Sequence, residues 1–187
     1  MEQESFYIQQ VIDGDVTRFA YFVTKYKELA FSIAMRILEN EQDAEEAVQD
    51  SFVRAFRSIK TFKGGARFST WLYRIVVNDS LNRLKKRKTV RQYEQIELAE
   101  EYFVQVECGY RRLTNQDQTK YINLALEKLA PEDRIILTLY YLEEQPLSEI
   151  AVITGISKEN IKMKLHRARG KMYGILSRIL GLELNLI

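Results

Sequence analysis

The sequence is 187 residues long, with 46% hydrophobic residues, 29% charged residues and a net charge of +2, as is ordinary for a soluble globular protein of one or two domains. It has no apolar run of 18 residues and begins with the polar stretch MEQESFYIQQ, so we expect no membrane span and no signal peptide. A single cysteine, Cys108, and a single histidine, His166, exclude an internal disulfide and a His/Cys metal cluster, so we expect a cytoplasmic protein without metal or other cofactor.

The charged residues are segregated along the chain rather than mixed. Residues 39–50, ENEQDAEEAVQD, contain acids and no basic residue. Residues 84–88, LKKRK, and residues 158–178 are strongly basic. Charge segregated in this way predicts more than one kind of partner, one anionic and one basic.

Helices are predicted along almost the whole chain, because only two prolines occur and almost no segment alternates with a period of two. In the first half, a long amphipathic helix is expected over residues 14–38 and a second from about Asn40 to Ile59. The stretch TFKGGARFS, with its paired glycines, interrupts this pattern. A third helix is expected to start after Ser69 and to run into the basic block at 84–88.

The second predicted helix has an acidic face opposite its apolar stripe. Asn40 followed by Asp43 resembles a capping pair at the start of the helix. The polar face consists of Asp43, Glu46, Gln49 and Asp50, and Phe52 belongs to the apolar stripe. Acids near a helix N-terminus are stabilised by the helix dipole and are commonly just solvated. The alternative is a docking face for a basic partner, and the residues alone leave both interpretations open.

The loop before the third helix and one side of that helix combine aromatic and cationic residues. The loop contains Lys63, Arg67 and Phe68 around the glycine pair 64–65. A polar ridge at helical spacing follows on the helix: Trp71, Arg74, Asn78, Asn82 and Lys85. Aromatic rings stack on unpaired bases while cations hold phosphates, so this combination suits single-stranded nucleic acid. The alternative is that Phe68 and Trp71 belong to the core.

The second half begins after a segment without clear periodicity, residues 89–117, which we interpret as a linker. Two helices are then expected over residues 121–129 and 131–144, the second starting with Pro131, which suits the first position of a helix. The run IILTLYYL could instead be a buried strand, but its setting between helices disfavours that alternative.

Residues 147–172, LSEIAVITGISKENIKMKLHRARGKM, predict two helices joined by a tight turn. Ala151 allows the helices to approach closely, Gly155 takes the turn, and Ile161 fills the gap between the helices. Ser157 can cap the second helix. The buried stripe of that helix consists of Ile161, Leu165, Ala168 and Met172. This layout is typical of a DNA-binding helix-turn-helix, and the alternative is a solvated amphipathic helix in an ordinary bundle.

The other faces of this last helix are predicted to contact DNA. The residues that project away from the buried stripe are Glu159, Met163, His166 and Arg167. The two flanks carry Lys158, Lys162 and Arg169 on one side, and Asn160, Lys164 and Lys171 on the other. Facing side chains are expected to meet base edges, and flanking cations are expected to meet phosphates.

Three motifs together resemble a known family. DAEEAVQDSFVRAF at 43–56 and FSTWLYRIVVNDSLNRLKKRK at 68–88 are similar to region 2 of the extracytoplasmic-function sigma factors, a group of the sigma-70 family. The helix-turn-helix at 147–172 is similar to their region 4.2. The resemblance implies an all-α fold of two small helical domains, region 2 over 1–90 and region 4 over 118–187, joined by a linker over 91–117.

The resemblance also implies a role for each motif. Binding to the β′ subunit of core RNA polymerase is carried over to Asp43, Glu46, Gln49, Asp50 and Phe52. Reading and melting of the promoter −10 element is carried over to Lys63, Arg67, Phe68, Trp71, Arg74, Asn78 and Lys85. Reading of the −35 element is carried over to Lys158, Glu159, Asn160, Lys162, Met163, Lys164, His166, Arg167, Arg169 and Lys171.

The expected partners are therefore core RNA polymerase, through its β′ and β subunits, and promoter DNA, with no small-molecule substrate. The resemblance adds an anti-sigma factor linked to the membrane as a further expected partner. The chain departs from the family pattern where Lys164 replaces a frequent Arg and Asn82 replaces a frequent Asp, which affects promoter choice rather than the class of function.

Two other classes of function compete with this interpretation. A free-standing helix-turn-helix regulator would explain residues 147–172, with the apolar tail ILSRILGLELNLI as a dimerisation surface, but would give the acidic helix no role. An enzyme is not expected, because no glycine-rich phosphate loop, metal cluster or nucleophile–base pair occurs.

Overall fold

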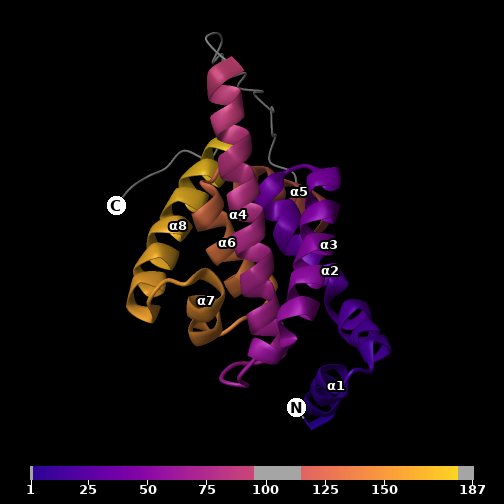
Figure 1. The fold of residues 1–187 in the computed structure, drawn as a ribbon. Coiled ribbons are helices and arrows are strands. Elements are labelled where there is room, and N and C mark those ends of the chain that lie inside the picture. Colours follow the sequence, from indigo (N-terminus) through magenta and orange to yellow (C-terminus); the bar gives the residue numbers. More distant parts are fainter. Residues whose placement is uncertain (1, 95–114, 181–187) are drawn as a thin grey trace.

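The computed structural model describes residues 2–94 and 115–180, and within these ranges the chain is helical with no strand (Figure 1). The predicted all-α fold is confirmed. We call residues 2–94 the N-terminal half and residues 115–180 the C-terminal half. In Figure 1, the long helix over Phe68–Glu94, labelled α4, stands between α2 and α3 on one side and α6, α7 and α8 on the other.

The N-terminal half contains four helices. They are α1 (Glu2–Ile12), α2 (Phe19–Leu38) after a short 3-10 turn at Val16–Arg18, α3 (Glu41–Ser58) followed by a 3-10 turn at Ile59–Thr61, and α4 (Phe68–Glu94). The Asn40 side chain accepts a hydrogen bond from the Asp43 backbone N–H at 2.9 Å, so the predicted cap of α3 is present.

Helix α1 is absent from the sequence prediction, which treats its residues only as a polar start of the chain. It packs against α2, and its Ile8 and Val11 side chains are buried. The Glu4 carboxylate accepts hydrogen bonds from the Lys25 ammonium and the Tyr26 hydroxyl of α2. Burial and this carboxylate raise the pKa of Tyr26 to about 12. The helix is therefore held by tertiary contacts rather than by strong local signals.

The C-terminal half contains α5 (Asn115–Glu127), α6 (Pro131–Leu137), a π-helical turn η3 (Thr138–Leu142), α7 (Leu147–Thr154) and α8 (Lys158–Ile179). The run IILTLYYL lies in α6 and η3, so the alternative of a buried strand is wrong. The π turn closes where the Glu143 N–H donates to the Thr138 carbonyl at 3.1 Å.

The turn between α7 and α8 follows the predicted helix-turn-helix pattern. Gly155 ends α7 with a φ of 72°, in the left-handed region that glycine adopts without strain. The Ser157 hydroxyl accepts from the Asn160 backbone N–H at 3.3 Å and so caps α8. Ile161 is fully buried between the helices.

The predicted linker and domain boundaries stay a prediction. Residues 91–94 continue α4 and residues 115–117 belong to α5. The part of the linker between them, which includes Cys108, lies outside the described residues, as do residues 181–187 of the apolar tail ILSRILGLELNLI.

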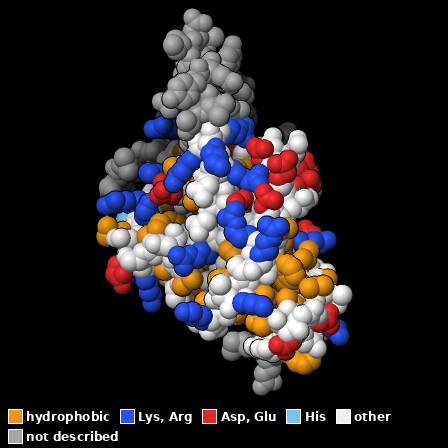
Figure 2. Space-filling view, viewed as in Figure 1, with side chains coloured by type: hydrophobic (Ala, Val, Ile, Leu, Met, Phe, Trp, Pro, Cys, Tyr) orange, Lys and Arg blue, Asp and Glu red, His pale blue; other side chains and the backbone are white. Residues whose placement is uncertain are grey.

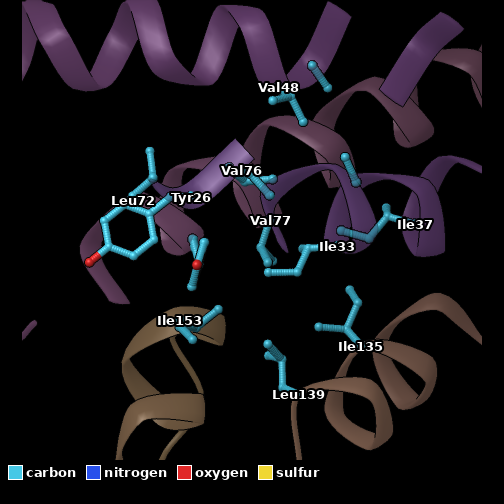
Figure 3. Close-up of a cluster of buried hydrophobic side chains, with 14 of the residues drawn as sticks. Tyr26, Ile33, Ile37, Val48, Leu72, Val76, Val77, Ile135, Leu139 and Ile153 are labelled. Carbon is cyan, nitrogen blue, oxygen red and sulfur yellow. The ribbon is translucent and has the colours of Figure 1, made fainter. Parts of the chain in front are cut away.

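One hydrophobic core runs through both halves (Figure 3). Ile33 of α2 and Val77 of α4 face Ile135 and Leu139 of the C-terminal half, and Ile153 of α7 points toward α4. All of these side chains are buried. The packing of α4 on α7 and of α2 on α6, which we call the closed arrangement, therefore joins the halves through apolar surface.

Arg134 of α6 adds a polar connection within the closed arrangement. Its guanidinium donates to the carbonyls of Leu126 at 2.7 Å and Leu129 at 3.0 Å, near the end of α5. It also donates to the Arg36 carbonyl at 2.8 Å and pairs with Glu39, at the end of α2. Carbonyls at helix C-termini lack partners within their helix, and the fork of donors on one arginine satisfies several of them at once.

Candidate polymerase-docking and nucleic-acid surfaces

Helix α3 separates an acidic exposed side from an apolar buried side, as its sequence predicts. Asp43 is half-buried and Glu46, Gln49 and Asp50 are exposed. The buried side consists of Ala44, Ala47, Val48, Ser51, Phe52 and Ala55. The assignment of Phe52 to a partner contact needs correction, because its ring is 7% exposed and meets Phe19 edge-on at 6.4 Å. Phe52 holds α3 in the core, and only the polar residues can face a partner.

The acids of α3 lie against arginines of α4. The sequence prediction does not include these ion pairs. Arg83 pairs with Glu46 at 3.4 Å and with Asp50, and Arg87 pairs with Asp43 at 3.0 Å. Residues paired in this way are 33 to 44 positions apart in the sequence.

Arg83 is also held by a buried acid of its own helix. Its Nε donates to Asp79 at 2.8 Å, and Asp79 also accepts from Arg54 of α3 at 2.9 Å. The hydrogen bond to Asp79 raises the pKa of Arg83. A cleft of about 630 Å³ opens beside this network, lined in part by Asp50, Arg54 and Asp79. Asp79 thus links Arg54 of α3 to Arg83 of α4.

The loop before α4 is exposed and cationic. Lys63 and Arg67 are exposed, and Gly64 has a φ of 71°, which favours glycine. The assignment of Phe68 to the nucleic-acid surface needs correction, because it is 2% exposed and its ring packs, tilted, against those of Phe22 and Trp71, with centroids 4.2 Å and 5.5 Å away. Phe68 begins α4 and faces α2, so it anchors the loop rather than projecting from it.

The ridge along α4 is exposed as predicted. Arg74, Asn78 and Lys85 are exposed on this helix, and Trp71 is half-buried with its ring 5.4 Å from that of Phe62. Figure 2 shows Lys and Arg side chains gathered along the course of α4 on this face of the molecule. Trp71 is therefore partly buried in the core and partly exposed to solvent, while the polar ridge is accessible.

Helix α8 buries the predicted stripe and exposes the predicted face. Ile161, Leu165 and Ala168 are buried, and Met172 packs at the edge of the core. The exposed face consists of Lys158, Glu159, Asn160, Lys162, Met163, His166, Arg167, Arg169 and Lys171, and Lys164 is half-buried.

Some cations on α8 are engaged with α6 and η3. Lys164 pairs with Glu132 at 2.7 Å and Lys171 pairs with Asp133 at 2.6 Å. Arg169 donates to the Tyr141 hydroxyl at 3.3 Å. One flank of α8 is thus partly neutralised within the protein.

The described residues contain neither a metal-binding cluster nor a membrane-spanning helix. No group of three or more His, Cys, Asp or Glu residues within them could hold a metal ion. None of the described helices is long and apolar enough to cross a membrane.

Comparison with known proteins accounts for both halves. The Sigma-70 region 2 model matches residues 22–90, and the Sigma-70 region 4 model matches residues 119–172. The ECF RNA polymerase sigma factor SigW of Bacillus subtilis is 33% identical over 179 residues, covering 87% of this chain and 90% of SigW. The chain belongs to the ECF sigma factors of the sigma-70 family. This sigma factor directs RNA polymerase to specific promoters in transcription initiation.

Other comparisons agree with this membership. The ECF sigma-E factor of Haemophilus influenzae is 30% identical over 172 residues, covering 87% of this chain and 89% of the relative. Two solved structures share the fold. CnrH in complex with the cytosolic domain of CnrY is 21% identical, with a TM-score of 0.67, and the match covers 92% of this chain and 96% of CnrH. RpoE in complex with the anti-sigma factor NepR from Bartonella quintana is 22% identical, with a TM-score of 0.64, and the match covers 85% of this chain and 96% of RpoE.

Family membership decides between the competing functions. All of the site residues predicted from the sequence lie inside the two matched segments. A free-standing helix-turn-helix regulator is set aside, because the match to region 2 gives residues 22–90 a role in a sigma factor. Helix α1 lies outside both matched segments.

Proposed function

We propose that the polar side of α3 docks this sigma factor on the β′ subunit of core RNA polymerase. The residues that would make the contact are Asp43, Glu46, Gln49 and Asp50. The observation that carries the proposal is their position: they lie on the solvent side of a helix whose other side is buried, within the segment that matches region 2. Exposed carboxylates can attract and orient a basic partner surface.

The −10 element would be read by the loop and ridge of α4. The residues proposed for this contact are Lys63, Arg67, Trp71, Arg74, Asn78 and Lys85. Their cations can hold phosphates, and the exposed part of Trp71 can meet a base that has left the duplex. Phe68 would support this surface from the core.

The −35 element would be read by the exposed face of α8. Glu159, Met163, His166 and Arg167 face away from the buried stripe and can reach base edges in the major groove. Phosphate contacts are proposed for the flanking residues Lys158, Asn160, Lys162, Lys164, Arg169 and Lys171. Lys164 and Lys171 would first have to exchange their acidic partners on α6.

Simultaneous reading of both elements requires the closed arrangement to open. A compact chain of 187 residues has a radius of gyration of about 16 Å. The two promoter elements are about 25 base pairs apart, or about 85 Å along the duplex, which is several times this radius. We infer that α7 and α6 separate from α4 and α2 when both DNA surfaces are engaged, with the linker proposed at residues 91–117 spanning the gap.

We further propose that the protein acts in the cytoplasm as a non-catalytic subunit and is held inactive by an anti-sigma factor linked to the membrane. The similar folds of CnrH, solved with the cytosolic domain of CnrY, and of RpoE, solved with the anti-sigma factor NepR, support an anti-sigma factor as a partner. The contact with the β subunit of core polymerase is proposed for region 4, residues 118–187.

Transcription in vitro tests the proposal. Core RNA polymerase would be combined with the purified chain and a library of promoter fragments, and the transcripts sequenced. We expect a defined set of start sites that share a −35 and a −10 motif and that vanish without the sigma factor. Stable binding to core polymerase without any selected start site would refute the promoter-reading part of the proposal.

A further inference from the structure

The acidic side of α3 is already occupied in part by cations of the same chain. Asp43, Glu46 and Asp50 are each paired with Arg83 or Arg87 of α4. We propose that these arginines compete with core polymerase for the acidic side of α3 and so set how tightly this sigma factor binds the enzyme. The inference rests on the docking role proposed for α3.

The two helices present matching rows of charge. The acids recur at i, i+3 and i+7 along α3, and the arginines recur at i and i+4 along α4. These spacings place each row on one side of its helix. Because α3 and α4 pack side by side, the rows meet along their length rather than at one point.

The exposure of the paired groups makes exchange feasible. The side chains of Asp50, Glu46 and Asp43 are 63%, 55% and 40% exposed, whereas those of Arg83 and Arg87 are 28% and 34% exposed. The carboxylates can therefore be reached from solvent while the arginines lie behind them. Ion pairs this exposed are weak, so a partner surface with several cations can displace them, at the expense of part of its own binding energy.

The two arginines differ in what holds them. Arg83 remains anchored by the largely buried Asp79 at 2.8 Å when its exposed partners are taken. Arg87 has, besides Asp43, a 3.4 Å contact to the Leu38 carbonyl. Loss of Arg87 therefore removes competition with little effect on the core, whereas loss of Arg83 also leaves Asp79 with Arg54 as its remaining ion-pair partner among the described residues.

Arg87→Gln is the decisive variant, and Lys86→Gln is its matched control. Both remove one positive charge from neighbouring positions of α4, but Lys86 is exposed and has no ion pair with any described residue. Each full-length variant would be labelled and titrated with core polymerase at several salt concentrations, with fluorescence anisotropy as the readout and thermal unfolding as the check on folding.

We expect Arg87→Gln to bind core polymerase about two- to fivefold more tightly, the range that one partly exposed ion pair supplies. Its affinity should fall more steeply with salt, because more uncompensated charge meets the partner. Lys86→Gln should stay near the wild-type affinity. In an Asp43→Asn background, Arg87→Gln should have no further effect, since the two residues act on one another.

The outcomes separate failure of this inference from failure of the docking role. If Asp43→Asn and Asp50→Asn weaken binding but Arg87→Gln leaves it unchanged or weaker, the competition is refuted and the docking face stands. Equal gains from Lys86→Gln and Arg87→Gln would also refute it, because the effect would then be one of net charge. If the aspartate variants bind like the wild type, both the docking face and the competition are wrong.

Discussion

Replacement of Phe68 separates a structural role at the start of α4 from a direct role on DNA bases. Its ring is 2% exposed and lies within 6.0 Å, centroid to centroid, of Phe22, Tyr26, Phe62 and Trp71. A ring in this position is inaccessible to a flipped base. It should therefore contribute to stability and act on promoter opening only through the position of the loop.

The size of the effect follows from the area that the ring buries. An aromatic side chain buries about 150–250 Å², which corresponds to about 4–6 kcal/mol of transfer free energy. Phe68→Ala keeps a part of this, so we expect the free energy of unfolding to fall by about 3–5 kcal/mol. Phe68→Leu keeps most of the apolar volume and should cost about 1–2 kcal/mol.

The assay combines urea unfolding with permanganate footprinting of thymines in the −10 region, at a temperature where each variant is folded. We expect Phe68→Leu to open promoters nearly as well as the wild type, because leucine can still anchor the loop. Arg74→Ala is the control from the exposed ridge; it should leave stability unchanged and reduce opening. If Phe68→Leu is as defective in opening as Arg74→Ala while remaining stable, the ring acts on bases and its assignment to the core role is wrong.

Three further predictions concern other parts of the chain. Arg134→Ala should lower the free energy of unfolding by about 3 kcal/mol or more in chemical denaturation, because it removes the side-chain donors to the Leu129 and Arg36 carbonyls; an unchanged midpoint would contradict this role. Arg167→Ala should cost about 1–3 kcal/mol of DNA-binding free energy and relax base preference in selection from randomised −35 elements. Lys171→Ala should weaken binding to all sequences alike and lower the salt dependence of binding by at most about one unit, because Asp133 already neutralises part of the charge of Lys171. Burial opposes the shift, but hydrogen bonds from Lys25 and Tyr26 leave the pKa of Glu4 below its ordinary value of 4.5. The stability that Glu4 contributes is therefore present above pH 4.5 and is lost as the pH falls through the lowered pKa. Glu4→Gln should remove this contribution to the loss of unfolding free energy at acid pH.

The sequence by itself determines the features that depend on local signals. The helix-turn-helix follows from Gly155 at the left-handed position, Ser157 as a cap and the stripe that begins at Ile161, and the structure contains all of these. The start of α3 follows in the same way from Asn40. Caps, turns and helical periodicity act over a few residues, so they can be recognised without knowledge of the fold. The order of the motifs also suffices to indicate the sigma factor family.

Only the tertiary structure decides which side chains of a helix are available to a partner. Phe52 and Phe68 occur in motifs that indicate function, but α2 covers them and places both in the core. The pairing of Arg87 with Asp43 joins residues 44 positions apart, and Glu4 holds α1 through residues of α2 at least 21 positions away. Such contacts depend on how helices pack, because periodicity within one helix does not specify which residues of another helix it will meet.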